Sequence, residues 1–391
     1  MLMKILLISN GHGEDLNASL IGEKLRVLDS RIEIDAFPIV GIGESYIRRN
    51  IPIVSPVKKM PSGGFIYLNP INLFKDLSAG LILLTLKQLN ALYGIRDNYD
   101  FVVSVGDTVS LLFAYMSGRG FVSFLVSYSS HYEGKLRLSP LDRFILNSCR
   151  CFQVFTRDKF TAEDLTRQGL KKVLYEGYPI LDTISQKTNL KHPSKKMVAL
   201  LPGSRLPEAL DNLAIQLRVC EILVERYGAA WQFCGAIVPS ITDGLLSELA
   251  ERIKWEYTPG KLRKKGVEVG VYYELFGDII SQCDVAIGMA GTAVEQAVGM
   301  GKPVVQIPGN GPQFTYRFAE AQQRLLGLNV LTIKPYLSLE KRCEEAAEKI
   351  SSIVNDEVFL KKCAENGKER IGEAGGSTRI AKRILALLNN S

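Results

Sequence analysis

The sequence is poor in histidine and lacks the cysteine patterns of metal sites and disulfide frameworks. Only three histidines occur among its 391 residues. The seven cysteines are scattered, and none belongs to a C-x-x-C pair with a second pair behind it. These absences argue against a zinc site and against disulfide bonding, and they predict a reducing, cytoplasmic environment.

The sequence also lacks an apolar run long enough to cross a membrane. The longest run, Leu77–Leu86, is about half as long as a bilayer span requires. The opening MLMKILLIS is too short for a signal peptide and continues as a strand. The run belongs to an expected helix over residues 72–93, for which two interpretations stay open. It is either a buried core helix or a helix that dips into one membrane leaflet beside the basic residues Lys58 and Lys59.

No nucleic-acid-binding motif and no stripe of alternating basic and aromatic residues is present, so nucleic acid is a weak candidate partner. The net charge of +7 suits an anionic substrate or an anionic membrane surface. No repeat of 20–50 residues is visible either, which excludes solenoids and propellers.

What the sequence does contain is a regular alternation of apolar strand-like runs and amphipathic helical stretches. Near-continuous apolar strands separated by helices indicate parallel sheets covered on both faces. The predicted strands are Lys4–Ser9, Ile32–Phe37, Phe101–Val105, Val122–Val126, Phe152–Phe155, Met197–Leu201, Trp231–Cys234, Val267–Val269, Val285–Ile287 and Val304–Ile307.

The polar segment SQKTNLKHPSKK at residues 185–196 separates two sets of about five strands. We therefore predict an α/β protein of two doubly wound, Rossmann-like domains facing a central cleft. The expected bounds are 1–186 for the first domain, 187–196 for a linker and 197–365 for the second domain. A C-terminal helix at 366–391 is expected to pack back across both domains.

The turn in LLPGSRLPEALDNL (residues 200–213) has the character of a phosphate site. It follows a strand and opens a helix, so its amides are placed to meet an anion. Gly203 allows close backbone approach, Ser204 can cap the helix or bind an oxygen, and Arg205 offers a fork of donors. The alternative is an ordinary strand–turn–helix connection with a surface arginine.

A second small-residue turn, Met289-Ala290-Gly291-Thr292, follows the strand at 285–287. The amides of Gly291 and Thr292 can face a phosphate. Glu295 lies one helical turn further on, where its carboxylate can accept both hydroxyls of a ribose. It also fits a capping box with Thr292, and the two roles can coexist. The following Gly/Pro loop and helix carry three amide side chains that are candidates to touch a sugar: Gln313, Gln322 and Gln323.

The opening turn, Gly11-His12-Gly13-Glu14-Asp15, resembles a dinucleotide-binding loop only in part. The third glycine of that fingerprint is missing, because Leu16 stands in its place. Glu14 and Asp15 occupy the start of the helix, where they complement the dipole and would repel a pyrophosphate. This turn is therefore better suited to the hydroxyl groups of an acceptor than to NAD.

Three motifs in order carry a resemblance: PGSR-x-x-E, then D-V-x-I-x-x-x-GT-x-x-x-E, then K-P-V-V. Together they resemble the donor-binding half of a GT-B glycosyltransferase, and among these a lipid-A-disaccharide synthase-related branch. GYPILD at 177–182 and VSVGDTVSLL at 103–112 are similar to further segments of that family. The resemblance spans most of the chain and is most specific in the second half.

The resemblance implies an inverting transferase that takes a sugar of N-acetylglucosamine type from a UDP-sugar, without metal or other cofactor. The first domain would bind a lipid-linked acceptor at the cytoplasmic face of the membrane, as a peripheral protein. Arg205 would neutralise the leaving diphosphate, which fits the lack of a D-x-D motif. The predicted donor-binding residues are Gly203, Ser204, Arg205, Phe276 (beside the uracil), Ala290, Gly291, Thr292, Glu295 and Gln313.

The acceptor hydroxyl needs a base. Asp107, on a turn after the strand at 101–105, is favoured over His12 by the resemblance, although Asp107 also fits the N-cap of a helix that starts at Thr108. Arg205 completes the predicted catalytic set. The predicted acceptor-binding residues are Gly11, Gly13, Glu14 and His131.

Three departures from the family pattern lie on the acceptor side. The opening turn reads NGHGED where the family has GEASGD, the aspartate segment has only Asp107, and SYSSHY at 127–132 replaces an aromatic-rich stretch. The identity of the acceptor is therefore left open. Two other functions are also kept: a UDP-GlcNAc epimerase of the same architecture, and a non-catalytic nucleotide-sugar-binding protein.

Overall fold

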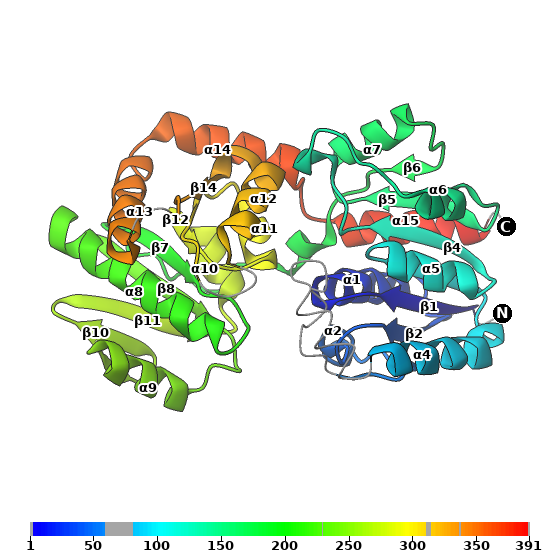
Figure 1. Ribbon diagram of the computed structural model, residues 1–391, viewed down its shortest axis with the longest axis horizontal. Helices are drawn as coiled ribbons and strands as arrows, with labels where there is room; N and C mark the ends of the chain where they lie inside the picture. The colour runs from blue at the N-terminus through cyan, green and yellow to red at the C-terminus, as the bar shows by residue number, and fades with distance from the viewer. Residues whose placement is uncertain (1–2, 59–80, 229, 310–313, 336–337, 390–391) are drawn as a thin grey trace. The chain divides into compact units, whose positions relative to one another are not determined.

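The computed structural model describes residues 3–58, 81–228, 230–309, 314–335 and 338–389 (Figure 1). The chain divides into two compact units. The first unit comprises Met1–Asp182 together with Glu373–Ser391, and the second comprises Thr183–Gly372. The second unit is therefore inserted between the body of the first unit and its last helix.

The first unit is built on a parallel sheet of six strands in the order β2-β1-β3-β4-β5-β6. In β1, Ile5 lies opposite Ile34 of β2 on one side and opposite Phe101 of β3 on the other, which defines the register of these three strands. The strands are almost fully buried, as expected for a parallel sheet that is covered on both faces. Their bounds are β1 Met3–Ser9, β2 Ile32–Pro38, β3 Phe101–Val105, β4 Gly120–Leu125, β5 Cys151–Thr156 and β6 Val173–Leu174.

Helices cover both faces of this sheet because consecutive crossovers are right-handed and the chain reverses direction after β2. Helices α4 to α7 contribute Leu92, Leu111, Ile145 and Leu165 to one core cluster. On the other face α1 packs against α15. The helices are α1 His12–Leu28, α2 Glu44–Ile47, α4 Leu81–Ile95, α5 Thr108–Met116, α6 Pro140–Asn147, α7 Lys159–Arg167 and α15 Gly376–Asn389, with 3₁₀ turns η2 Arg96–Asn98, η3 Ser130–Tyr132 and η4 Pro179–Thr183.

The second unit contains an eight-stranded sheet in the order β14-β13-β12-β7-β8-β11-β10-β9. Strands β9 and β10 form an antiparallel hairpin extension, and the other strands are parallel. The strands are β7 Lys196–Leu201, β8 Trp231–Ile237, β9 Glu256–Thr258, β10 Lys261–Lys264, β11 Val267–Tyr273, β12 Val285–Gly288, β13 Val304–Gln306 and β14 Val330–Thr332.

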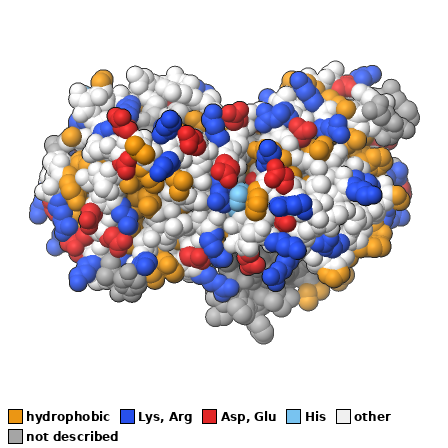
Figure 2. Space-filling view, turned by 90° about the horizontal axis from the view of Figure 1, so that it is seen from above, with side chains coloured by type: hydrophobic (Ala, Val, Ile, Leu, Met, Phe, Trp, Pro, Cys, Tyr) orange, Lys and Arg blue, Asp and Glu red, His pale blue; other side chains and the backbone are white. Residues whose placement is uncertain are grey.

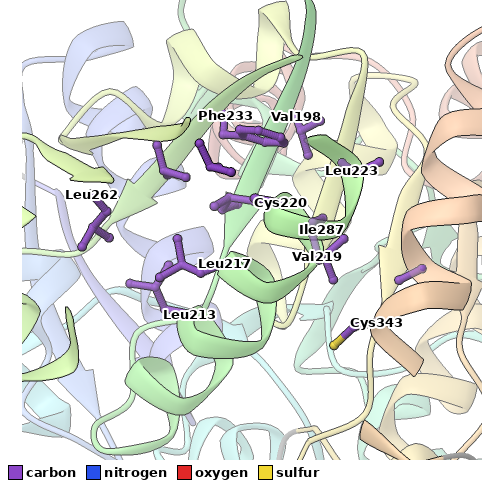
Figure 3. Close-up of a cluster of buried hydrophobic side chains, with 14 of the residues drawn as sticks. Val198, Leu213, Leu217, Val219, Cys220, Leu223, Phe233, Leu262, Ile287 and Cys343 are labelled. Atoms are coloured by element: carbon purple, nitrogen blue, oxygen red, sulfur yellow. The ribbon is translucent and has the colours of Figure 1, made fainter. Parts of the chain in front are cut away.

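The core of the second unit forms where α8 packs on the middle of its sheet. Leu217, Cys220 and Leu223 from α8 gather beside Val198 and Phe233 from the strands (Figure 3). The helices are α8 Glu208–Tyr227, α9 Asp243–Ile253, α10 Phe276–Gln282, α11 Thr292–Gly299, α12 Tyr316–Leu326, α13 Leu339–Ile353 and α14 Glu357–Arg370, with the 3₁₀ turn η5 Gly327–Asn329.

Every strand expected from the sequence is present, and the α/β fold class is confirmed. The strands that the sequence did not reveal are short or lie at an edge: β6, β9, β10 and β14. The segment expected as a linker belongs to the second unit. Its Lys187 amide donates to Asp278 Oδ1 at 2.6 Å, and its Leu190 amide donates to Gln282 Oε1 at 2.8 Å. The polar composition of this segment therefore reflects its hydrogen bonds to the second unit, and it does not mark a linker between the units.

The structure also bears on two features of composition, the apolar runs and the net positive charge. None of the helices that the structure describes combines the length and apolarity that a membrane span requires. On the face seen in Figure 2, lysine and arginine side chains are interspersed with acidic side chains over both units. The net positive charge is therefore not gathered into one basic stripe on that face.

The carboxylate of Asp182 binds the start of the last helix, α15. Asp182 accepts hydrogen bonds from the Gly375 amide, from the Ser377 hydroxyl and, at 2.8 Å, from the Ser377 amide. The backbones also touch, since a Cβ at Gly376 would lie 2.8 Å from the carbonyl carbon of Gly177. The two places where the chain passes between the units therefore lie side by side on the first unit. We call this arrangement the Asp182 clamp.

Replacement of the clamp carboxylate, Asp182→Ala, is expected to lower the free energy of unfolding by about 2–3 kcal/mol, because several donors lose a charged acceptor. Urea unfolding measures this loss. The matched control is Asp97→Ala, which removes an exposed ion pair to Arg119 and should cost less than about 1 kcal/mol. Equal losses in both variants would show that the clamp carries no special stability.

Candidate functional site

Each sheet has one switch point, where the chain stops adding strands on one side of its first strand and continues on the other side. In the first unit the chain starts at β1, adds β2 on one side and then crosses to β3 on the other. In the second unit it starts at β7, moves to β8 and β11, and then crosses back to β12. The loops that leave the carboxyl ends of such strand pairs diverge, and ligands of open α/β sheets bind there. These two positions are the candidate sites.

At the first position, Asn10 follows β1 and Asp107 follows β3. The Asn10 side-chain amide donates to Asp107 Oδ1 at 2.8 Å, and the Val109 amide donates to the same oxygen at 2.9 Å. Asp107 is thus the N-cap of α5, so the capping interpretation is correct. Burial raises the pKa of Asp107, while the bonds from Val109 and Asn10 oppose that rise.

Glu14 joins the same group from the first turn of α1. Its Oε1 accepts a hydrogen bond from the Ser127 hydroxyl at 2.7 Å. Its Oε2 lies only 2.5 Å from the position that a Cβ of Gly11 would occupy, so Gly11 must be glycine for the carboxylate to fold back. Loops after β1, β3 and β4 thereby bring two carboxylates, an amide and a hydroxyl together. Asn10 and Ser127 were not singled out from the sequence, although Asn10 directly follows β1 and Ser127 lies two residues beyond β4.

The two histidines predicted for this site lie elsewhere on the first unit. The exposed His12 ring contacts the loop after β2, where its Cε1 is 3.0 Å from the place of a Cβ on Gly41. The His12 ring thus faces the loop after β2, whereas Asp107 stands on the loop after β3. The His131 side chain is only 8 % exposed and stacks on Phe160, with 4.7 Å between ring centroids. The structure does not bring His131 to Asp107 and Glu14.

Three buried polar side chains are hydrogen-bonded to one another beneath the opening turn. Asp15 is 1 % exposed, and its Oδ1 accepts a hydrogen bond from the Ser9 hydroxyl at 2.6 Å. The Ser9 hydroxyl also bonds to the Tyr46 hydroxyl at 2.5 Å. Burial raises the pKa of Asp15 well above its ordinary value, and the nearby Glu14 charge adds to this rise. Of the two acids at the helix start, Asp15 is therefore turned into the protein, whereas Glu14 lies among the loops with Ser127.

At the second position the turn after β7 lies against the turn after β12. The Met289 amide donates to the Leu201 carbonyl at 2.9 Å. Gly203, with φ of 94°, passes so close to Met289 that a Cβ would lie 3.0 Å from its carbonyl oxygen. The loop after β13 joins them, since a Cβ at Gly309 would lie 3.2 Å from Met289 Cε and a Cβ at Gly203 would lie 3.9 Å from a ring carbon of Phe314. These contacts draw three loops together at the carboxyl edge of the sheet.

The backbone amides at this position are directed by buried side chains. The Asn212 side chain, 2 % exposed on α8, donates to the Pro202 carbonyl at 3.0 Å. Because the carbonyl and the amide of a trans peptide point in opposite directions, this bond directs the Gly203 amide away from α8. Asn212 is another residue that the sequence did not single out. Arg205 follows the turn and is half-buried, and burial lowers its pKa while Glu208 opposes this.

Two capping roles expected from the sequence are wrong. The N-cap of α8 is Pro207, so Ser204 does not cap that helix, and its side chain is exposed. The N-cap of α11 is Gly291, whose carbonyl accepts the Val294 amide at 3.1 Å. Thr292 is then the first helical residue, too far along the helix to form a capping box with Glu295.

The remaining predicted donor residues are spread along the same edge. Ala290, Gly291, Thr292 and Glu295 lie at the start of α11, and Glu295 is partly buried in its first turn. Phe276 is the first residue of α10, after β11. Gln313 lies outside the described residues. In the described part of the chain, no group of three histidine, cysteine or acidic side chains has the arrangement of a metal site.

Comparisons with known proteins were made for sequence and for fold. No protein-family model matches the chain. Lipid-A-disaccharide synthase from Geobacter metallireducens is 25% identical over 234 residues, which cover 55% of this chain and 57% of that protein. The Geobacter sulfurreducens enzyme of the same name is 26% identical over 206 residues, covering 50% of each. The chain thus spans about half the length of the curated relatives it matches.

Among solved structures, the calicheamicin glycosyltransferase CalG4 matches with a TM-score of 0.64 and 13% identity, over 100% of this chain and 99% of that one. The chain has the GT-B fold. The GT-B fold is shared by UDP-GlcNAc 2-epimerase from Methanocaldococcus jannaschii, with a TM-score of 0.56, 15% identity and full coverage of both chains. A complex of Staphylococcus aureus MnaA with UDP has a TM-score of 0.59 and 14% identity, with 99% and 97% coverage. The predicted resemblance to lipid-A-disaccharide synthase is confirmed.

The buried acid Asp15 gives a prediction with a definite sign. Since its folded-state pKa is raised, the folded protein holds this proton at pH values where the unfolded chain has released it, so stability falls as the pH rises. The unfolded chain has released this proton above about pH 4, so the stability of Asp15→Asn relative to the wild type should increase steadily from pH 5 to pH 8. Thermal unfolding across this range measures the difference.

Asp29→Asn serves as the control for that experiment. The pKa of Asp29 is lowered to about 2 by its hydrogen bonds to Arg31, so both folded and unfolded states are ionised between pH 5 and pH 8. Its effect on stability should be constant over the range. A constant difference for Asp15→Asn as well would contradict the raised pKa.

Proposed function

We propose that the protein is a metal-independent, inverting glycosyltransferase. It moves a sugar of N-acetylglucosamine type from a UDP-sugar to a lipid-linked acceptor, as a peripheral protein at the cytoplasmic face of the membrane. The observation that carries the proposal is the pair of glycine turns after β7 and β12. They present backbone amides at the switch point of the second sheet, with Arg205 beside them.

The chemistry required of the second unit is to stabilise departing charge. When the bond from the anomeric carbon to the diphosphate oxygen breaks, the electron pair leaves with UDP. Fixed donors at the amides of Gly203, Gly291 and Thr292, with the guanidinium of Arg205, stabilise that charge without a metal ion. Glu295, in the first turn of α11, is assigned to the ribose hydroxyls. The structural similarity to a protein crystallised with UDP supports a nucleotide site in this fold.

The chemistry required of the first unit is to activate and orient a hydroxyl. The acceptor oxygen attacks the anomeric carbon from the face opposite UDP, which inverts the configuration, and its proton passes to the Asp107 carboxylate. Asn10 orients that carboxylate through its bond at 2.8 Å. Glu14 and the backbone of Gly11 and Gly13 are assigned to other hydroxyls of the acceptor.

A lipid-linked acceptor is supported by one face of α4. Ile82, Leu83 and Leu86 are 62%, 58% and 58% exposed, and Lys87 follows them. On the opposite side of the same helix, Leu84 and Leu92 are buried. The helix thus packs apolar side chains against the core on one side and exposes apolar side chains on the other, as contact with a lipid would require.

The donor site is tested by Arg205→Ala, assayed with radiolabelled UDP-GlcNAc and lipids extracted from host membranes. Loss of one fixed donor to the leaving group should lower the transfer rate by roughly 10²–10³-fold. Arg263→Ala, in the exposed β10 strand of the same unit, should leave the rate unchanged. Full activity of Arg205→Ala would exclude the proposed donor site.

The base is tested by Asp107→Asn, which keeps an oxygen for the Val109 and Asn10 bonds but cannot accept a proton. Transfer by the wild type should fall as the pH drops through a value above the usual carboxyl range, because burial raises the Asp107 pKa. The variant should be slower by roughly 10²–10⁴-fold and lose this pH dependence. A fully active variant, together with an inactive His12→Gln, would assign the base to His12 instead.

A UDP-GlcNAc 2-epimerase is the second candidate, because proteins of that name share the fold over the full chain length. Incubation with UDP-GlcNAc alone, followed by chromatography of the sugar nucleotide, separates the candidates. Formation of the 2-epimer without any acceptor would favour the epimerase. Binding of UDP without turnover of any donor would instead favour a non-catalytic binding protein.

A further inference from the structure

A line of buried polar side chains runs along the carboxyl edge of the second sheet. Thr332 ends β14, and its hydroxyl donates to Gln306 Oε1 at 3.1 Å. Gln306 ends β13, and its side-chain amide donates to Gln322 Oε1 on α12. Gln322 Nε2 in turn donates to the Gly291 carbonyl at 2.9 Å and approaches the Ala290 carbonyl at 3.4 Å. Gln306 and Gln322 are only 2% and 5% exposed.

This line has a direction, because each member donates towards the next. A glutamine side chain carries both a donor and an acceptor, so Gln322 alone could present either group to the turn. With its oxygen occupied by Gln306, only its NH₂ group remains to face Gly291. The carbonyl oxygens of Ala290 and Gly291 can only accept, so they select the NH₂ group of Gln322. The bonds from Gln306 and from the Thr332 hydroxyl then hold that arrangement from the other end of the line.

The bonds to carbonyl oxygens also direct the amides of the turn. The Ala290 carbonyl and the Gly291 amide belong to one planar peptide and point in opposite directions. The same holds for the Gly291 carbonyl and the Thr292 amide. With both carbonyls held towards Gln322, both amides point away from it. There is room on that turn, since a Cβ at Gly291 would meet no atom within 4 Å.

We propose that Gln322 is a positioning residue, which holds the turn at 290–292 so that two amides converge on the diphosphate of the donor, and that Gln306 and Thr332 hold Gln322 in place. This inference rests on the proposed donor site. It adds residues that touch neither donor nor acceptor and yet set the strength of diphosphate binding. The turn after β7 differs in this respect, because there the Pro202 carbonyl accepts from Asn212.

The test is calorimetric titration of Gln322→Leu with UDP and, separately, with uridine. Leucine has a similar size but cannot hold the carbonyls. Loss of this positioning should weaken UDP binding by about tenfold, on the scale of one to two hydrogen bonds, and leave uridine binding unchanged. The matched control is Gln323→Leu, the next residue of α12, which is exposed and contacts the Thr332 amide rather than the turn. It should bind both ligands as the wild type does.

The outcomes separate the inference from the proposal beneath it. If the wild type binds UDP and Gln322→Leu binds it equally well, the positioning role is overturned and the donor site is retained. If UDP and uridine binding weaken together, the effect is a general loss of structure and the positioning role is again overturned. If the wild type binds no UDP, the donor site and the inference fail together.

A second pair of variants covers a Gln322→Leu protein that does not fold. Thr332→Val keeps the shape of the side chain and removes the hydroxyl at the start of the line, whereas Thr332→Ser keeps the hydroxyl. Thr332→Val should weaken UDP binding by about threefold, as expected for part of one hydrogen bond. Thr332→Ser should restore wild-type binding. Equal UDP affinity in Thr332→Val and the wild type would overturn the orienting role of the line.

Discussion

The parallel pairing of β1 with β3, and of β7 with β12, decides where this protein can do chemistry. Each pair joins strands that are distant in the sequence and end at the same edge of a sheet. The loops beyond them are therefore neighbours without being packed into the core. Residues such as Asn10 and Asp107, separated by 97 positions, meet only for this reason. The order of the strands in each sheet therefore determines where the candidate sites lie, and the motifs determine only which side chains stand there.

The two edges differ in the residues that form their turns. In the first unit, Asn10 and Asp107 stand in the turns after β1 and β3, so an amide and a carboxylate side chain meet there. In the second unit the turns after β7 and β12 contain glycine and alanine, and the carboxylates of Glu208 and Glu295 stand only in the first helical turns beyond them. This difference follows from the residues after four strands and needs no difference in fold.

The sequence reveals the strands and the glycine turns because both are local patterns. Apolar runs identify the central strands, whereas β6 has only two residues and gives no such signal. Contacts between distant segments could not be read in this way. His12 is adjacent to the Glu14 turn in sequence, yet its ring lies by Gly41, because helical rotation sends successive side chains in different directions. Gln322 is a polar residue on an amphipathic helix, and only the position of α12 makes it a partner of Gly291.

The Asp182 clamp has a consequence for the order in which the protein is made. Helix α15 covers α1, but the chain must pass through the whole second unit before residues 376–389 exist. A ribosome adds roughly 5–20 residues per second, so α1 stays without its partner helix for many seconds after its own synthesis. The second unit is contiguous and can be completed earlier. The unit that begins first is therefore finished last, and during translation its uncovered helix is the surface that a chaperone would meet.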